Sequence, residues 1–369
     1  MIKILFLQPG YAHYREDLFS ILSKRHNIHF LFEKSKNTYP GEENPKQIKY
    51  TFIDKKFKNT FIGLIYYLYK YKYDIVISSV SSSTRSIVSF IFTLISKKKF
   101  ILWILEWKRP IYKGNYYRKL IKTIKYWIGK RIIIQSHALI VGGAAARNYA
   151  IILGKNKREI FTALQCSKDI KKQKNPSKKN IYNNNKYTFL FLSRIIAWKG
   201  LDILIKAFYL LKQERNDISL LVAGDGPSKK HCLEMAKFLN ISDVDFIGSI
   251  NPNRTKEIYE KGDVFILPSY ELDAFYEDWG LVVNEAMSMK LPLITTTGVG
   301  ASFDMIVNGY NGFVVRENSV VELYQAMNNI LKCDLFELGT NSRKVFDEKN
   351  NYEKMANGFS DAIGYVNKF

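Results

Sequence analysis

Residues 264–290 read VFILPSYELDAFYEDWGLVVNEAMSMK and decide the fold interpretation. The run Val264–Pro268 is short and apolar, as in a buried strand, and Glu285–Lys290 has the composition of a helix. Between them, Glu277 and Glu285 stand eight positions apart, roughly 12 Å if that segment is helical. A strand that leads through a polar turn into a helix is the repeating unit of a parallel α/β sheet.

The turn before this helix predicts an anion site. A helix N-terminus presents unpaired backbone N–H groups and a partial positive charge, so we expect a diphosphate over Asp278, Trp279, Gly280 and Leu281. The two flanking acids suit a nucleotide sugar, with hexose hydroxyls at Glu277 and ribose hydroxyls at Glu285. The ordinary alternatives are that the first acid is solvated in an acidic loop and that the second only complements the helix dipole.

A second loop supplies cations. Arg194 and Lys199 follow another predicted strand, on the side where open α/β sheets bind ligands. The planar guanidinium group of Arg can donate two parallel hydrogen bonds, and the ammonium group of Lys is a compact positive charge. Both suit a diphosphate. The alternative is that both residues are ordinary surface cations on a loop.

Taken together, these residues resemble the donor site of glycosyltransferase family 4. Further matches occur in the expected order through most of residues 187–315, and they include Gly200–Phe208, Ala223–Pro227, Phe246–Gly248, Leu267–Ser269 and Asn308–Gly312. The resemblance implies an α/β protein of the GT-B fold, with two Rossmann-like domains facing each other across a cleft. It also implies transfer from a nucleoside diphosphate sugar with retention. No cofactor is expected, and no metal is expected because Arg194 and Lys199 can neutralise the leaving diphosphate.

The resemblance assigns further residues. Gly248 and Ile250 are expected to border the nucleobase, and Glu277 is expected to hold the transferred sugar. The N-terminal half matches more loosely, and there Tyr14 and Arg15 are expected on the acceptor side. Gly10 follows the first predicted strand, where a glycine lets a backbone approach a ligand closely.

One departure affects the mechanism. Many family members have a histidine after a middle strand of the first domain, whereas this chain has Leu105-Glu106-Trp107 there. We therefore expect Glu106 to be the first-domain residue nearest the reacting centre. Its ordinary alternative is an ion pair with Lys108 or Arg109.

Length and charge set the domain organisation. The 369 residues carry a net charge of +22, and residues 1–160 contribute +21, from 30 Lys and Arg against 9 Asp and Glu. The sequence predicts an acceptor-binding domain at residues 1–167, a donor-binding domain at 187–350 and a C-terminal helix at 351–369 that crosses back. The polar segment 168–186 is the predicted linker.

Strands are predicted from short apolar runs that alternate with helical patterns. They are residues 2–7, 28–32, 74–78, 100–105 and 138–141 in the first half, and 189–193, 219–223, 244–247, 264–267, 292–295 and 312–315 in the second.

The positive first half predicts an anionic partner. Residues 115–128 place Tyr117, Leu120, Ile121, Ile124 and Ile128 on one helical face among cations, as in a helix that lies on an anionic membrane. Residues 57–73 have a similar composition. The alternative is that both are surface helices whose apolar stripe packs on the sheet.

Other classes fit less well. Cys166, Cys232 and Cys333 have neither disulfide-framework nor zinc-site spacing, and the apolar stretch 86–95 is too short to span a bilayer. The sequence thus predicts a cytoplasmic glycosyltransferase, peripheral on the inner membrane face, that acts on a glycan or lipid-linked acceptor in cell-envelope synthesis. The alternatives are a non-catalytic basic protein that binds nucleic acid or an anionic membrane, and a transferase-like scaffold without turnover.

Overall fold

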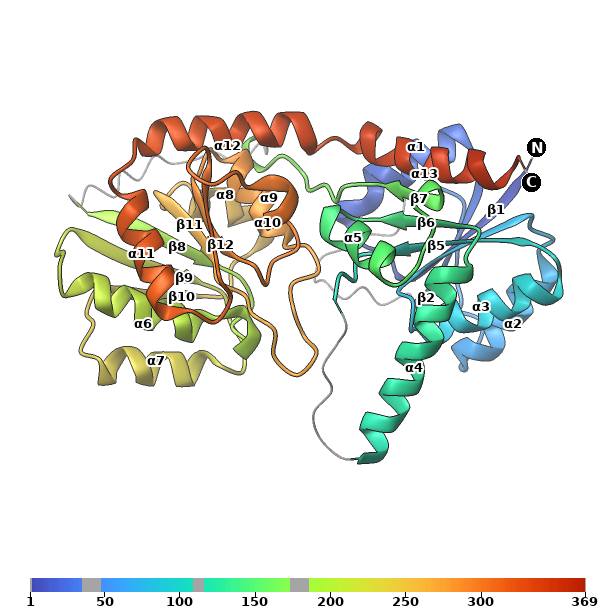
Figure 1. The fold of residues 1–369 in the computed structure, drawn as a ribbon, viewed down its shortest axis with the longest axis horizontal. Helices are drawn as coiled ribbons and strands as arrows, with labels where there is room; N and C mark the ends of the chain where they lie inside the picture. The colour runs from blue at the N-terminus through green and yellow to red at the C-terminus, as the bar shows by residue number, and fades with distance from the viewer. Residues whose placement is uncertain (1, 35–47, 109–115, 173–185, 369) are drawn as a thin grey trace. The chain divides into compact units, whose positions relative to one another are not determined.

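The computed structural model describes residues 2–34, 48–108, 116–172 and 186–368 (Figure 1). The chain forms two compact units, one of Met1–Cys166 with Asn351–Phe369 and one of Ser167–Asn350. Each unit contains one sheet, of seven strands in the first and six in the second, and every neighbouring pair of strands is parallel. The predicted α/β class with two Rossmann-like domains is confirmed.

The first sheet has the order β3-β2-β1-β4-β5-β6-β7. Its strands are β1 (Lys3–Gly10), β2 (Asn27–Lys34), β3 (Tyr50–Phe52), β4 (Ile75–Ser79), β5 (Lys99–Ile104), β6 (Ala138–Val141) and β7 (Ile160–Thr162). The sequence prediction missed β3 and β7, the two edge strands, because three residues are too few to show a periodic pattern. The direction of strand order reverses between β1 and β4, the position at which open α/β sheets bind ligands.

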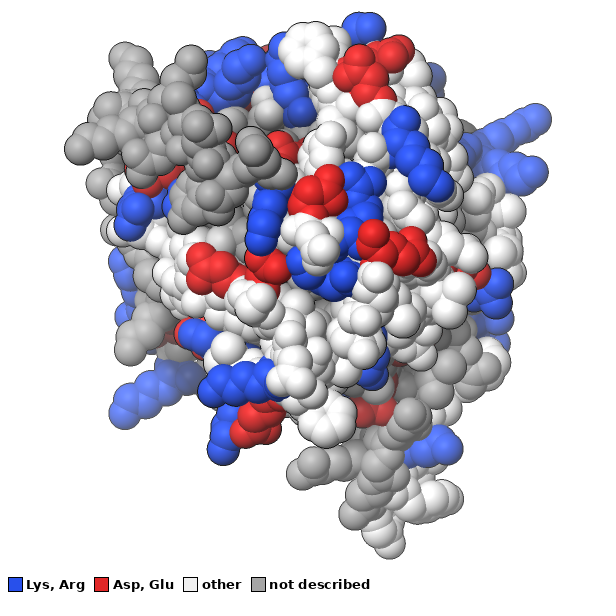
Figure 2. Space-filling view, turned by 90° about the vertical axis from the view of Figure 1, so that its left-hand side faces the viewer, with Lys and Arg blue, Asp and Glu red and all other residues white. Residues whose placement is uncertain are grey.

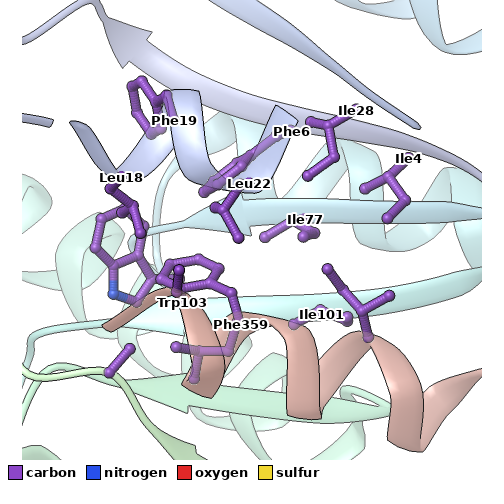
Figure 3. Packing of buried hydrophobic residues seen from close by; sticks show 14 of the residues in the cluster. Ile4, Phe6, Leu18, Phe19, Leu22, Ile28, Ile77, Ile101, Trp103 and Phe359 are labelled. Atoms are coloured by element: carbon purple, nitrogen blue, oxygen red, sulfur yellow. The ribbon is translucent and has the colours of Figure 1, made fainter. Parts of the chain in front are cut away.

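Helices cover both faces of this sheet. They are α1 (Glu16–Arg25), α2 (Thr60–Lys70), α3 (Thr84–Ile95), α4 (Tyr116–Gln135), α5 (Ala144–Ile152) and α13 (Tyr352–Val366). On one face, α1 and α13 bury Phe19 and Phe359 against Phe6 and Trp103 (Figure 3). The C-terminal helix α13 is thus a structural part of the first unit's core.

The second sheet has the order β10-β9-β8-β11-β12-β13. Its strands are β8 (Tyr187–Leu192), β9 (Ile218–Ala223), β10 (Val244–Gly248), β11 (Val264–Leu267), β12 (Leu293–Thr296) and β13 (Gly312–Val315). The helices are α6 (Leu201–Lys212), α7 (Lys229–Phe238), α8 (Thr255–Tyr259), α9 (Leu281–Ser288), α10 (Ser302–Met305), α11 (Val320–Ile330) and α12 (Leu335–Lys349). Here the strand order reverses between β8 and β11, the strands that precede the two predicted donor-site loops.

The second unit has a mixed surface charge. On the face shown in Figure 2, acidic and basic side chains alternate without a large patch of either sign. The unit begins at Ser167, at the start of the predicted linker, of which residues 173–185 lie outside the described part of the chain.

Candidate active site

Helix α9 begins at Leu281, four residues before the helical start that the sequence suggested. The earlier residues Val282 and Val283 are β-branched and were assigned to the turn. The backbone of Gly280 has φ 95°, and a Cβ there would lie 3.2 Å from Glu277 Cγ and from a methyl carbon of Leu267. This left-handed residue ends the turn, so the free N–H groups of α9 lie where the diphosphate was predicted. The helical spacing assumed between the two acids does not apply, because Glu277 precedes the helix.

Lys199 and Glu277 form an ion pair between the two predicted loops. Their side chains are only 11% and 14% exposed. Lys199 Nζ also lies 4.5 Å from the ring centroid of Trp198. The Glu277 backbone is fixed in turn, since its carbonyl accepts a hydrogen bond from the N–H of Gly300 at 2.9 Å. The structure therefore brings together the predicted sugar-binding acid and one predicted phosphate-binding cation.

Gly200 fixes the position of the Lys199 loop against β11. Its φ is 74°, and a Cβ there would lie 2.1 Å from the carbonyl oxygen of Pro268. The segment that follows β11 is hydrogen-bonded to the same loop, because the N–H of Tyr270 donates to the carbonyl of Trp198 at 2.9 Å. Only a glycine permits this approach, so the loop that carries Lys199 is held at the carboxyl end of the sheet.

Arg194 lies just after β8 and is exposed, and it forms no ion pair with any residue that the structure describes. Gly248 ends β10, two strands away in the same sheet, and its carbonyl accepts from the N–H of Gly224 at 2.7 Å. Ile250 follows, partly exposed. These predicted residues share the carboxyl edge of the second sheet.

Glu285 lies in the second turn of α9 and is bonded to a residue that the sequence prediction missed. The buried hydroxyl of Tyr259, in α8, donates to Glu285 Oε2 at 2.9 Å. Although part of the Glu285 side chain reaches solvent, burial of the carboxyl raises its pKa to about 7, against the lowering effect of that hydrogen bond. Tyr259 ends a short helix, where a tyrosine is usually part of the hydrophobic core. Nothing in the sequence distinguishes it from such a core residue.

Three of the predicted diphosphate-binding positions differ in exposure. Asp278 is exposed and Leu281 partly so, but Trp279 is buried, and its indole N–H donates to Asn284 Oδ1 at 2.9 Å. The amide of Asn284 donates in turn to Asn350 Oδ1 at 2.9 Å. The Trp279 side chain therefore supports the loop from inside, and only its backbone remains for a ligand.

The predicted acceptor-side residues lie at the carboxyl end of β1. Gly10 ends the strand, and a Cβ there would meet nothing closer than 3.8 Å. Arg15 Nη1 donates to Gln8 Oε1 at 2.7 Å, and its guanidinium lies 4.5 Å from the ring centroid of Trp103. The carbonyl of Tyr14 accepts from the hydroxyl of Tyr352, in α13, at 2.7 Å.

Glu106 follows β5 in the same unit. Its Oε1 accepts from the N–H of Ser81 at 2.9 Å and from the Ser81 hydroxyl at 3.2 Å, while Oε2 is buried without a hydrogen-bond partner among the described residues. Burial raises the pKa of this carboxyl. Lys108 Nζ instead lies over the ring of Trp107, at 4.7 Å, and Arg109 lies outside the described residues.

Helix α4 exposes the apolar residues that were predicted for a membrane face, namely Tyr117, Leu120, Ile121, Ile124 and Ile128, and it also exposes Trp127. The alternative in which this stripe packs against the sheet is therefore wrong. Close packing begins at Gly129, where a Cβ would lie 3.0 Å from the Ser81 hydroxyl. Helix α2 buries Leu64, Tyr67 and Leu68 on one side and exposes Phe61, Ile62, Ile65 and Tyr69 on the other. No helix in the described ranges is both long and apolar enough to cross a bilayer.

The described residues contain no group of three or more His, Cys, Asp or Glu side chains placed to hold a metal ion. One Asp-x-Asp triplet, Asp243-Val244-Asp245, occurs at the start of β10. Its first carboxylate is paired with Lys186 and, at 2.8 Å, with Lys212. The triplet begins at the opposite end of the strand from Gly248 and so lies away from the carboxyl edge.

Comparison with known proteins agrees with this architecture. An uncharacterised glycosyltransferase of Methanocaldococcus jannaschii is 25% identical over 316 residues, which cover 81% of this chain and 76% of that protein. The capsular polysaccharide biosynthesis glycosyltransferase CapM of Staphylococcus aureus is 25% identical over 58% of this chain and 54% of its own length. Among solved structures, HepE of Anabaena in complex with UDP superposes with a TM-score of 0.79 at 15% identity, over 98% of this chain and 100% of that one. Residues 171–351 match the family model described as glycosyl transferases group 1, and the chain is a glycosyltransferase of the GT-B fold.

Proposed function

We propose that this glycosyltransferase takes its sugar from a nucleoside diphosphate sugar held by the second unit, and transfers it with retention. The observation that carries the proposal is the Lys199–Glu277 ion pair beside the first turn of α9. In this proposal Glu277 accepts hydrogen bonds from the sugar, Glu285 accepts them from the ribose, and the backbone of Gly248 to Ile250 borders the base. The UDP complex of HepE makes uridine nucleotides the first to test.

The ion pair suggests how binding would proceed. Without donor, Glu277 neutralises Lys199. On binding, the diphosphate replaces Glu277 as the anion beside Lys199, Arg194 adds a second cation, and the sugar hydroxyls donate to the released carboxylate. The bond between the anomeric carbon and the diphosphate oxygen breaks as the acceptor oxygen bonds to the same face. The acceptor proton passes to the leaving phosphate.

Catalysis would then rest on stabilisation of the departing diphosphate by Lys199, Arg194 and the N–H groups of α9. We propose that these fixed charges do this without a cofactor or a divalent metal. In the first unit, Glu106 is proposed as the residue nearest the reacting centre. Its Oε2 has no hydrogen-bond partner among the described residues, and this atom and the raised pKa support a role in hydrogen bonding at that centre.

For the acceptor, we propose a glycan or lipid-linked glycan of cell-envelope synthesis. The relationship to a capsular polysaccharide enzyme supports this. The excess positive charge of residues 1–160 and the exposed apolar residues of α4 support an anionic membrane surface as partner, on its cytoplasmic face. Nucleic acid is not proposed as a partner.

The test is a thermal-shift panel of UDP, GDP, ADP and their sugars, followed by a transfer assay with the nucleotide sugar that binds. A ligand that binds only the folded state raises Tm, so one nucleotide should shift the wild type. Lys199→Met should lower turnover by about 100-fold, because it removes one preorganised donor from the leaving group. Lys206→Met, which removes an exposed cation from α6, is the control and should leave turnover unchanged. If no nucleoside diphosphate or its sugar shifts Tm, or if both variants lose turnover equally, the proposal fails.

A further inference from the structure

Four buried N–H donors near the carboxyl ends of β1, β4 and β5 have no acceptor among the described residues. They are Gln8 Nε2, Arg15 Nε, Arg85 Nε and Trp103 Nε1. The Gln8 side chain is completely buried, and Arg85 and Trp103 are 4% and 2% exposed. A buried donor without an acceptor costs free energy, and native proteins rarely leave several close together. All four are donors, so a group that satisfied them would have to supply acceptor oxygens.

These donors lie at one place in the sheet. Phe6 on β1 pairs with Ile77 on β4, and Gln8 and Ser79 each follow two residues later, toward the carboxyl ends of these strands. Ser79 pairs with Trp103 on β5. Arg85, in the first turn of α3, donates to the carbonyl of Ser79 at 3.1 Å. The cluster therefore spans the gap between β1 and β4, where the strand order reverses and where helices leave for opposite faces.

The cluster is also cationic. Arg85 pairs with Glu33 at 2.5 Å, but Arg15 is hydrogen-bonded to the neutral amide of Gln8 and stacked on Trp103. In the described part of the chain, Arg85 is thus paired with a carboxylate and Arg15 is not. Burial lowers the pKa of Arg85, Glu33 raises it, and the charge of Arg15 lowers it further, which is consistent with two cations close together.

We propose that Gln8, Arg15, Arg85 and Trp103 bind an anionic group of the acceptor, a phosphate or a carboxylate. Guanidinium groups recognise both anions through charge-assisted hydrogen bonds, and the amide and indole donors add direction. The assignment of this anion to the acceptor rests on the proposed function. The anion site itself is independent of the donor site. It narrows the acceptor from any glycan to one that carries an acidic or phosphorylated group.

The test measures anion binding to the full-length chain by calorimetry at constant ionic strength. Inorganic phosphate and glucuronate are the probes, and glucose is the neutral control. We expect the wild type to bind one anion and not glucose. Tighter binding of phosphate identifies a phosphorylated acceptor, and tighter binding of glucuronate identifies an acidic sugar.

Two substitutions and one matched control locate the site. Gln8→Glu keeps the shape of the side chain and its contact with Arg15, but replaces the donor amide with a carboxylate. Arg15→Gln removes the cation. We expect either change to weaken anion binding by about tenfold or more, the effect of losing a hydrogen bond to a charged group. Arg147→Gln removes another partly buried cation of the same unit, which donates to the carbonyl of Ile160, and should change affinity less than about twofold.

Three outcomes would overturn the inference. The first is that the wild type binds no anion more tightly than glucose. The second is that Arg147→Gln weakens binding as much as Arg15→Gln, because the attraction is then a property of the whole basic unit. The third is that Gln8→Glu and Arg15→Gln lose the Tm shift from UDP along with anion binding, because the donors then serve the nucleotide's own phosphates. Absence of any nucleotide shift in the wild type would instead count against the proposed function alone.

Discussion

The hydroxyl of Tyr259 donates a 2.9 Å hydrogen bond to Oε2 of Glu285, and it joins α8 to the second turn of α9. This bond stabilises the ionised carboxylate, whereas burial favours the neutral form. Burial dominates, and the pKa of Glu285 rises from 4.5 to about 7. The residue proposed to hold the ribose therefore changes its charge near neutral pH.

Glu285→Gln should change how stability depends on pH. The folded-state pKa lies above the unfolded value, so between pH 4.5 and about 7 the folded chain binds more protons than the unfolded chain. The wild type therefore loses stability as pH rises through this window, by up to about 3 kcal/mol. The variant keeps an acceptor for Tyr259 and should lack that loss. Denaturant unfolding at pH 5 and pH 8 measures the difference.

The control for this prediction is Glu234→Gln, the same change at an exposed acid of α7. Its stability should follow the wild-type pH dependence. If Glu285→Gln also follows it, the carboxyl is already ionised well below pH 7. In the proposed donor site, UDP affinity of the wild type should increase as pH rises through about 7, because an ionised carboxylate is the stronger acceptor for ribose hydroxyls.

The Lys199–Glu277 pair should show a measurable coupling energy. Both side chains are nearly buried, so removing one partner leaves the other charge uncompensated. A double-mutant cycle of Lys199→Met and Glu277→Gln should give about 1–3 kcal/mol of coupling in unfolding free energy. The same cycle on Lys230 and Glu234, whose side chains are 89% and 64% exposed, should give less than about 0.5 kcal/mol. Equal coupling in both cycles would mean that the site pair is as solvated as a surface pair.

Most of the fold is encoded locally, and this explains which parts the sequence predicted. Runs such as Ala138–Val141 and Val264–Leu267 became strands with the predicted bounds, because they are fully buried and bounded by polar residues. Lys199 and Glu277 were predicted to share a ligand, but their direct ion pair was not, because 78 residues separate them and only tertiary structure sets the distance.

The sequence did not reveal the roles of Tyr259 and Arg85 or the true start of α9, and in both cases tertiary contacts are the reason. Tyr259 and Arg85 are single residues in helices, and their significance comes from partners on other elements, Glu285 and Glu33. The start of α9 was placed four residues late because Val282 and Val283 favour strands, whereas tertiary packing and the left-handed Gly280 impose the helix there.

Gly280→Ala should disturb the start of α9. An alanine there adopts a disfavoured backbone and its Cβ lies 3.2 Å from Glu277 Cγ, so we expect a loss of about 2 kcal/mol of stability and weaker UDP binding. Gly309→Ala isolates the backbone contribution, because φ there is 76° and a Cβ would meet nothing within 4 Å. It should cost about 1 kcal/mol and leave UDP affinity unchanged. Equal effects on UDP binding from both variants would show that the crowding at Gly280 does not position the site.

Helix α4 should bind the first unit to anionic membranes. Its first three turns expose apolar residues together with Lys119, Lys122 and Lys125. An apolar face inserts into the headgroup layer, while each nearby lysine adds about 1 kcal/mol of attraction. Replacing these three lysines with glutamine should weaken sedimentation with anionic vesicles on the order of 100-fold at low salt. Neutral vesicles should bind the wild type and this variant alike.

The apolar part of that surface is tested separately. The triple variant Ile121→Ser, Ile124→Ser and Trp127→Ser should lose vesicle binding and keep the UDP shift, because these side chains are exposed and add little to the core. The control triple, Val321→Ser, Phe238→Ser and Phe336→Ser, removes exposed apolar residues from the second unit. It should bind vesicles as the wild type does. Wild-type chain that stays in the supernatant with anionic vesicles at low salt would exclude a membrane role for α4, and equal losses in both triples would assign binding to general surface hydrophobicity.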